Sequence, residues 1–488
     1  MIIDHIYQWA HIQPNRNAII ANNAVITYAE FAKGIEITRK FLECQQLPRG
    51  ATIGLLMQNL LDCWIVCIAS RAIGLNTVAV RNISEAQQLR VHKLWCFVDT
   101  EAEASNLVMP KDVDATIITV PKTIYGNIQQ HGLPTPLETE SLYGGHILYT
   151  SGTTGANKKL LWGARDEDRR ISARANFHGY KNRTIFHNLN YPLWTGAGFK
   201  RPLSVWMAGG CVVFDQTDDI FLNFFRHKIT NSLLLPSILS QLLAATCKRR
   251  SEKSSEPITL DVGGSILKRH QIMRALDQLS SNIIAEYSAT ELLTPPLMST
   301  VRNEDDIEWL RPLDGRDVSV VTDEHVLTAP NVEGFLRVRL NDLDFTSYYD
   351  EVEGQSALVD GYFYPGDMAV KRADGRIRIL GRVDAVLNVQ GRKMAVQPIE
   401  QSIQGYFGVD EVCVFGHIND AGQEELIVAI ESPTPPSEAK LDSVRKRFST
   451  FDSVRFHVLN KFPRSNTGTG KIRRIVLKNL LTKGVAKG

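Results

Sequence analysis

The sequence lacks the features of membrane, secreted and nucleic-acid-binding proteins. Its apolar runs are far shorter than a membrane span, and its first residues do not join a basic segment to an apolar one, as a signal peptide would. The formal net charge is only +2, too small for an overall field that attracts nucleic acid. Its 7 cysteines show no metal-ligand spacing, which is typical of a reducing compartment. We therefore expect a cytoplasmic protein that neither enters a membrane nor binds nucleic acid.

The composition and the residue pattern indicate a globular protein with parallel sheets. Hydrophobic residues make up 43% and charged residues 22% of the 488, which is enough core for two or three domains. A helix is expected from Thr27 to about Cys44, then a strand at 51–57, a helix at 59–74 and a strand from residue 78. This alternation of strands and helices predicts an α/β fold.

Residues 149–160 combine glycines, hydroxyls and lysines after a short apolar strand. Glycines let backbone N–H groups turn toward an anion, hydroxyls donate hydrogen bonds, and lysines supply positive charge, so the segment suits a phosphate group. A polar surface loop is the alternative. The spacing of the common P-loop is absent, and a near match at 467–471 fails because Ile472 replaces the hydroxyl that would bind magnesium.

This segment, which we call the phosphate loop, resembles that of the adenylate-forming enzymes, the superfamily of acyl-CoA synthetases, adenylation domains and luciferase-like enzymes. Their pattern is close to Thr-Ser-Gly-Thr-Thr-Gly-x-Pro-Lys, and the only departure here is Asn157 in place of the proline. The resemblance implies that the loop binds the nucleotide through Thr150, Ser151, Gly152, Thr153, Thr154, Gly155 and Lys158.

Residues 282–291 resemble a second motif of the same superfamily, Tyr-Gly-x-Thr-Glu. The resemblance implies that Tyr287 stacks on adenine, that Thr290 bonds a phosphate oxygen, and that Glu291 holds Mg²⁺, which prefers a carboxylate together with phosphate oxygens. Ser288 stands where acetate-specific relatives carry a tryptophan that closes the acyl pocket, so a larger acid is expected. Alone, a Thr-Glu pair after a strand is more often an ordinary helix cap.

A Gly-Gly turn at residues 260–267 is similar to the wall of the family's acyl and nucleotide pocket. Gly263 is assigned to the acyl pocket, and Gly264 and Ser265 to the nucleotide, because glycine allows a backbone to approach a ligand closely. A plain turn would have the same sequence.

The segment 188–199 occupies the place of a Pro-x-Phe-His motif that is not intact in this chain. Trp194 is the nearest aromatic residue, and we assign it to the acyl pocket. Gly196 falls about where members that activate amino acids carry an aspartate for the substrate amine, and it belongs to the same pocket. A glycine offers an ammonium group no partner, which disfavours an α-amino acid substrate.

Three motifs follow toward the end of the chain. Residues 361–367 resemble Gly-Trp-Phe-x-Thr-Gly-Asp, which implies that Asp367 accepts hydrogen bonds from both ribose hydroxyls. Residues 381–393 resemble the interdomain hinge, and residues 462–473 the motif with the catalytic lysine. The resemblance assigns the nucleotide to Arg382, the hinge to Asp384, the thiol tunnel to Gly391 and catalysis to Lys471.

The same resemblance implies a division of labour along the chain. A large N-terminal domain, 1–381, would have parallel-rich sheets, helices and a small β-barrel-like part, and would bind ATP and the acid. A hinge at 382–387 would lead to a small α+β lid domain at 388–488. Two reactions at one site, in which the small domain rotates between them, suit such a construction.

The expected activity is ATP-dependent activation of an aryl or medium-length acyl acid as its acyl-AMP, with Mg²⁺, and then transfer to the thiol of coenzyme A. Glu291, the hydroxyls of the phosphate loop and Lys471 would stabilise the charge that develops. Two alternatives stay open: an enzyme that loads the phosphopantetheine of a separate acyl carrier protein, and a nucleotide-binding pseudoenzyme with a regulatory role. Residues 158–183 carry eight basic and three acidic side chains, either a solvated helix face or a docking surface for an acidic carrier.

Overall fold

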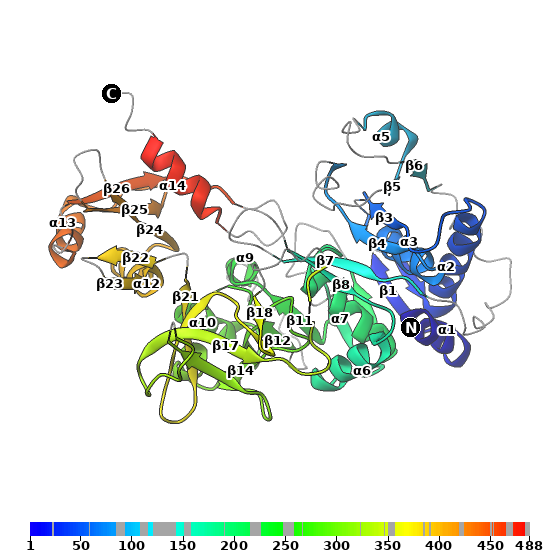
Figure 1. Ribbon diagram of the computed structural model, residues 1–488, viewed down its shortest axis with the longest axis horizontal. Helices are drawn as coiled ribbons and strands as arrows, with labels where there is room; N and C mark the ends of the chain where they lie inside the picture. Colours follow the sequence, from blue (N-terminus) through cyan, green and yellow to red (C-terminus); the bar gives the residue numbers. More distant parts are fainter. Residues whose placement is uncertain are drawn as a thin grey trace. The chain divides into compact units, whose positions relative to one another are not determined.

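The structure, a computed structural model, is shown in Figure 1. It describes residues 1–21, 24–57, 59–83, 93–107, 116–120, 143–150, 158–189, 191–214, 226–246, 258–265, 267–322, 324–345, 347–349, 357–383, 386–389, 392–418, 424–448, 451, 453–464 and 472–483. Contacts divide the chain into two units, 1–307 with 340–361, and 308–339 with 362–488. In these described ranges, no helix has both the length and the apolar character to cross a membrane.

One sheet of the first unit has the strand order β6-β5-β3-β4-β7-β8. It is parallel except for β8, which runs antiparallel to β7. The central strand β3 is buried at every position, as expected for a parallel sheet covered on both faces. The strands are β3 (Thr52–Leu55), β4 (Asn76–Ala79), β5 (Leu94–Val98), β6 (Ile117–Thr119), β7 (His146–Thr150) and β8 (Lys158–Trp162).

The strands of the other sheet that belong to this unit have the order β14-β13-β12-β11-β9-β10-β1-β2. Its inner strands are parallel, whereas β2 and β14 run antiparallel to their neighbours. The strands are β1 (Asn17–Ala21), β2 (Ala24–Thr27), β9 (Ile185–His187), β10 (Cys211–Val213), β11 (Asn231–Leu234), β12 (Thr259–Val262), β13 (Asn282–Tyr287) and β14 (Leu297–Thr300).

The helices of the first unit begin where the sequence supplies caps. The Thr27 hydroxyl accepts from the Glu30 backbone N–H (3.2 Å) while the Glu30 carboxylate accepts from Thr27 N–H (2.8 Å), a capping box that begins α2 as expected. Asn59 caps α3 in the same region. The helices are α1 (Ile2–Ile12), α2 (Tyr28–Glu43), α3 (Leu60–Ala72), α5 (Glu101–Ser105), α6 (Glu167–Phe177), α7 (Gly196–Met207), α9 (Pro236–Thr246), α10 (Arg269–Gln278) and, at the end of the unit, α11 (Asp305–Glu308).

Helix α7 is the centre of this unit's core. It contacts β7 of one sheet and β10 of the other, and it packs on α1 and α6. Its first turn is closed by Thr195, whose hydroxyl accepts from the Gly198 N–H at 2.9 Å. Farther along, the Trp64 ring of α3 stacks on Phe199 (5.4 Å between centroids) and meets Trp206 edge-on (4.9 Å). Aromatic packing therefore fixes one face of α7. Because the helix cannot rotate, the directions of its other side chains are fixed as well.

The second unit begins with an antiparallel sheet. Strand β17 is paired by β16 on one edge and by β19 and β20 on the other, and β21 pairs with β20. No ladder joins β21 to β16 among the strands described, so the β-barrel-like part expected from the sequence is instead an open sheet. The strands are β16 (Val318–Val321), β17 (Glu333–Arg339), β19 (Tyr362–Phe363), β20 (Asp367–Lys371) and β21 (Ile377–Arg382); the short β15 (Arg311–Pro312) and β18 (Leu358–Val359) lie nearby in the sequence.

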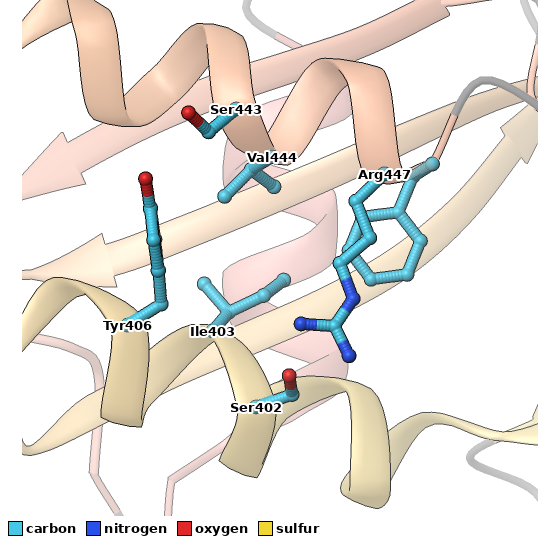
Figure 2. A pocket seen from close by; sticks show the side chains of 7 residues that line it. Ser402, Ile403, Tyr406, Ser443, Val444 and Arg447 are labelled. Atoms are coloured by element: carbon cyan, nitrogen blue, oxygen red, sulfur yellow. The ribbon is translucent and has the colours of Figure 1, made fainter.

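The rest of the second unit is α+β, as expected for the small domain. A hairpin, β22-β23, precedes a three-stranded sheet of order β24-β25-β26. A shallow hollow between α12 and α13 is lined by Ile403, Tyr406, Val444 and Arg447 (Figure 2), and none of the site residues expected from the sequence lines it. The elements are β22 (Val386–Val389), β23 (Arg392–Ala395), α12 (Val396–Phe407), β24 (Glu411–Ile418), β25 (Glu424–Glu431), α13 (Glu438–Arg447), β26 (Ser453–Leu459) and α14 (Arg474–Lys483).

Candidate active site

The candidate site forms where the parallel strands β9, β11, β12 and β13 end. The carboxyl ends of parallel strands meet at one edge of a sheet, where α/β proteins bind ligands. Val262 lies opposite Ala285 in the β12–β13 ladder, so the Gly263–Gly264 turn that follows β12 lies beside Tyr287 at the end of β13. Residues that the sequence assigned to one pocket are thus brought to the same edge.

The turn after β13 carries Thr290 and Glu291. The Glu291 side chain is 6% exposed, and one of its oxygens accepts a hydrogen bond from the Tyr348 hydroxyl at 3.1 Å. Burial raises the pKa of the Glu291 carboxyl above its usual range, although the Tyr348 hydroxyl and the nearby cations Lys200 and Lys158 oppose this rise. The site therefore holds a buried carboxylate whose charged form a further cation would stabilise.

The backbone of this turn is bound from several sides. Lys200 of α7 donates from Nζ to the carbonyl oxygens of Thr290 (2.6 Å) and Leu292 (2.9 Å). The carbonyl of Glu291 itself accepts from the Phe345 N–H at 3.0 Å. Burial lowers the pKa of the Lys200 ammonium well below its usual value, and the nearby Arg174 adds to this decrease. The turn is thus fixed by hydrogen bonds to three consecutive carbonyls.

Both backbone polar groups of Leu293, the next residue of the turn, form hydrogen bonds. Its N–H donates to the Asp344 carboxylate at 2.7 Å, and its carbonyl accepts from the Arg174 guanidinium. Asp344 is 1% exposed. Asp344, Phe345 and Tyr348 therefore supply the turn with a carboxylate, a backbone N–H and a hydroxyl.

Lys158 begins β8, and among the loop residues assigned to the nucleotide it is the one whose side chain the structure describes. Its ammonium lies 4.8 Å from the centre of the Tyr348 ring, whose hydroxyl binds Glu291. The structure therefore brings Lys158 and Glu291 together through Tyr348, a residue that no sequence motif indicated. Thr150 ends β7, and residues 151–155 lie outside the described residues.

Of the expected acyl-pocket residues on the segment that leads into α7, Gly196 lies beside this turn. A Cβ built on Gly196 would lie 3.4 Å from the side chain of Thr290. The carbonyl of Trp194 accepts from the Tyr149 N–H at 2.9 Å, and the His146 ring nitrogen Nε2 lies 3.0 Å from the Leu193 carbonyl. This segment is therefore tied to β7, the strand that leads into the phosphate loop.

The local structure explains the glycines at positions 263 and 264 without reference to a ligand. A Cβ on Gly263 would lie 2.5 Å from the Glu286 carbonyl oxygen, and one on Gly264, whose φ is +78°, would lie 2.7 Å from Leu235. Ser288 and Ser265 are exposed. Close approach of the Glu286 backbone at Gly263, and the positive φ at Gly264, are thus sufficient to favour glycine at these positions.

Two of the expected nucleotide residues lie in the second unit. Asp367 begins β20 and is 8% exposed, and its carboxylate lies 3.6 Å from the Arg382 guanidinium at the end of β21. Arg382 also donates to the Pro365 carbonyl. The structure thus pairs Asp367 with Arg382. The hinge residue Asp384, Gly391 of the thiol tunnel and Lys471 lie outside the described residues, and their roles stay predictions.

Magnesium is the metal implied by the family resemblance, and the donor set suits it. In the described part of the chain, no three His, Cys, Asp or Glu side chains form a cluster that could hold a metal. Magnesium needs no such cluster, because it is commonly held by one or two carboxylates and the phosphates of the substrate. The buried Glu291 carboxylate fits this mode, with Thr290 beside it.

Several basic side chains of the segment 158–183 are buried or pack against other side chains of the protein. Arg174 and Lys159 are buried, and Arg170 packs over the rings of Trp162 (5.5 Å) and Phe345 (4.9 Å). Arg169, Lys181 and Arg183 are exposed, but Arg169 forms an ion pair with Asp342. The segment is therefore neither a fully solvated helix face nor a continuous basic surface.

Comparison with known proteins places this site in a family. The chain is 24% identical to a 4-chlorobenzoate–CoA ligase of an Arthrobacter species (97% of this chain, 94% of the relative). It is also 24% identical to an acetyl-coenzyme A synthetase of Chlorobaculum tepidum (99% and 82%). It is 26% identical to the 2,3-dihydroxybenzoate-AMP ligase of Bacillus subtilis over 61% of this chain and 56% of the relative.

Solved structures show the same fold. The O-succinylbenzoate coenzyme A synthetase of Bacillus subtilis in complex with AMP matches with a TM-score of 0.78 at 18% identity, covering 97% of this chain and 98% of that one. An amide bond synthetase from Marinactinospora thermotolerans matches with a TM-score of 0.77 at 17% identity, covering 98% and 99%. The model of the AMP-binding enzyme family matches residues 6–349, and the chain belongs to that family.

Proposed function

We propose that this protein is an AMP-forming acid–thiol ligase that activates an aryl or medium-length acyl acid and transfers it to coenzyme A. In the first reaction a carboxylate oxygen attacks the α-phosphorus of ATP, the bond to the β-phosphate breaks, and pyrophosphate leaves. In the second, the thiol sulfur attacks the acyl carbonyl, the thiol proton is lost, and AMP leaves. Membership in the AMP-binding family supports this reaction class.

The buried Glu291 carboxylate is the observation on which the proposal depends most. A lone carboxylate at 6% exposure is costly unless a cation pairs with it, and Lys200 is already bound to backbone carbonyls. Glu291 and Thr290 would hold Mg²⁺ and a phosphate oxygen, and Mg²⁺ would neutralise charge on the triphosphate. Tyr348 orients the carboxylate, and Lys158 adds positive charge on the same side of the turn.

The remaining residue roles follow from their places in the sequence and the fold. The phosphate loop, Tyr287, Gly264 and Ser265 would contact the nucleotide in the first unit. Asp367, paired with Arg382, would accept from the ribose hydroxyls. Lys471, Asp384 and Gly391 keep the roles that the family resemblance gives them: catalysis of adenylation, the hinge, and the thiol tunnel.

Features of the pocket edge support an aryl or medium-length acid. Ser288 is exposed and small, so it leaves the space that a tryptophan would fill, and Gly196 offers no carboxylate to a substrate amine. Two of the relatives are named for benzoate-type acids and one for acetate, so the names alone do not decide the acid.

Coenzyme A is favoured over a carrier protein as the acceptor. A carrier would dock through an exposed basic surface, but Arg170 and Arg174 of the basic segment point into the core. Two relatives that match nearly all of this chain are named as a CoA ligase and as an acetyl-coenzyme A synthetase.

Pyrophosphate exchange over a panel of carboxylic acids tests the proposal. We expect exchange with a benzoate-type or medium-chain acid, and thioester formation with coenzyme A but not with a phosphopantetheinyl carrier. Ser288→Trp should lower turnover of the preferred acid about tenfold or more and relatively favour a two- or three-carbon acid, because the ring fills the pocket edge. A wild-type preference for acetate or a proteinogenic amino acid would contradict the acid class, and no exchange with any acid would contradict the function.

A further inference from the structure

We propose that Lys200 is a positioning residue that fixes the Thr290–Glu291 turn in the form that takes Mg·ATP. The inference rests on the proposed function, since it assigns Glu291 to magnesium, but it concerns a residue that no motif of the chain indicated. Lys200 lies on α7, 90 residues before the turn that it binds.

The contacts of Lys200 are specific to the backbone of the turn. Its Nζ is 2.6 Å from the carbonyl oxygen of Thr290 and 2.9 Å from that of Leu292, the two residues that flank Glu291. A buried amine with two N–H donors satisfies both acceptors at once, which an apolar side chain would leave unpaired. Because the two carbonyls are held on one nitrogen, the residue between them has little freedom to rotate.

The surroundings make this arrangement rigid. Lys200 is 2% exposed, and its ammonium lies 5.2 Å from the centre of the Phe345 ring. The N–H of Phe345 in turn donates to the Glu291 carbonyl. The charged groups around the amine are the carboxylates of Glu291 and Asp344 and the guanidinium groups of Arg170 and Arg174.

The position of Lys200 on α7 links the turn to the rest of the site. Gly196, one helical turn earlier on the same face, lies against the Thr290 side chain. The helix therefore touches the turn at two points, once with a glycine that permits close approach and once with an amine that binds carbonyls. Since α7 is fixed by aromatic packing, it provides a rigid support for the metal-binding carboxylate.

Lys200→Met tests the proposal because methionine keeps the chain length and removes the donors. Tyr28→Phe is the matched control: it also removes one buried donor to a carbonyl, from the Tyr28 hydroxyl to Gly210 at 2.7 Å, in the same unit but away from the turn. Two readouts are measured. One is the rise in melting temperature with Mg·ATP compared with ATP and a chelator, and the other is the Mg²⁺ concentration for half-maximal pyrophosphate exchange.

We expect Lys200→Met to lose most of the extra thermal shift that magnesium gives and to raise the half-maximal Mg²⁺ concentration about tenfold or more. The shift with ATP and chelator should stay close to wild type, and Tyr28→Phe should leave both magnesium responses unchanged. If Lys200→Met lowers the melting temperature but responds to magnesium like the control, Lys200 only stabilises the fold, and the proposal is wrong.

A second variant covers the case in which Lys200→Met does not fold. Lys200→Gln keeps an amide with two N–H donors at a shorter reach, so it should show a weakened magnesium response, and a response equal to that of Tyr28→Phe would overturn the proposal. If wild type shows no exchange with any acid, the proposed function fails, and the thermal shift with Mg·ATP still decides the role of Lys200.

Discussion

Two neighbouring residues of α7, Lys200 and Arg201, bind two different kinds of partner. Lys200 binds backbone carbonyls of the turn after β13. Arg201 binds carboxylates beneath that turn: it donates to Asp261 of β12 and, at 3.0 Å, to Glu286 of β13. Because successive side chains on a helix point about 100° apart, one helix reaches both the site and the strands that support it.

The difference shows how a buried basic side chain can serve either to position a turn or to stabilise the fold. The carbonyls at Lys200 are dipoles, so loss of the amine leaves unpaired acceptors at a cost of about 1–3 kcal/mol. The carboxylates at Arg201 are 6% exposed each, and loss of the guanidinium leaves them without this cation, at a cost of about 3–5 kcal/mol. We therefore expect Arg201 to control whether the strands form and Lys200 to control how the turn is set.

The largest effect is expected for Arg201→Met. The free energy of unfolding, measured by urea denaturation, should fall by about 3–5 kcal/mol because Asp261 and Glu286 lose their shared partner. The triple variant Arg201→Met, Asp261→Asn and Glu286→Gln should recover a large part of that loss, since no buried carboxylate remains unpaired. A loss no greater than that of Lys200→Met would break the distinction between the two residues.

The next effect concerns His146, whose ring stacks on Phe199, the residue before Lys200, at 4.1 Å. Burial lowers the pKa of His146 to about 3, and the nearby Arg71 adds to the decrease. In the unfolded chain His146 binds a proton near its ordinary pKa of 6.5, whereas in the folded chain it stays neutral down to its lowered pKa. The stability contributed by the neutral ring is therefore fully present above pH 6.5. It decreases by about 1.4 kcal/mol per pH unit as the pH drops toward 3.

Comparison of wild type with His146→Gln measures this contribution. Urea midpoints at several pH values between 7 and 4 should converge as the pH falls, because the variant lacks the histidine's proton uptake on unfolding. Glutamine keeps an amide donor for the Leu193 carbonyl, which the histidine contacts at 3.0 Å. Parallel pH profiles for the two proteins would contradict a neutral buried histidine.

The smallest effect is expected for Tyr348→Phe, which changes the turn without touching α7. Burial raises the pKa of the Glu291 carboxyl, and the hydrogen bond from the Tyr348 hydroxyl lowers it. Removal of the hydroxyl should therefore let this pKa rise further. The hydrogen bond is worth about 1 kcal/mol. The half-maximal Mg²⁺ concentration should rise a few-fold, and more at pH 6 than at pH 8, because a smaller fraction of the carboxyl is ionised at pH 6. An equal increase at both values would show that the hydroxyl does not act through ionisation of Glu291.

Several features of the fold and site could be predicted from short stretches of sequence. Thr27 caps its helix as expected, and the helix expected from residue 59 begins with Asn59 as its cap, since a cap needs only side chains within three residues. The Thr-Glu pair at 290–291 was assigned from its motif, and the structure places it at the end of a parallel strand. The barrel-like part was not predicted correctly, because sheet closure depends on pairing between strands far apart in the chain.

The partners of the buried charges were also beyond prediction from the sequence. The basic segment was interpreted as a surface feature, whereas Arg170 contacts residues 343–345 and Arg174 contacts Leu293, all more than 100 positions away. A signal for Lys200 and Arg201 existed, namely two charges inside the otherwise apolar run Gly-Phe-Lys-Arg-Pro-Leu-Ser-Val-Trp. Their carbonyl and carboxylate partners could not be read from it, because those lie on β12, β13 and the turn that follows.

The amino-acid chain alone carries the residues that chemistry needs, in an order that indicates the family: the phosphate loop, the Thr-Glu pair, Asp367 and Lys471. Helix caps are equally local, since each depends on atoms a few residues apart. The tertiary structure adds Tyr348, Lys200 and Phe345 to Glu291, from segments 54 to 91 residues distant. A side chain's charge, burial and hydrogen bonds depend on neighbours that only folding brings within a few ångströms, so these relations could not be present in the sequence pattern itself.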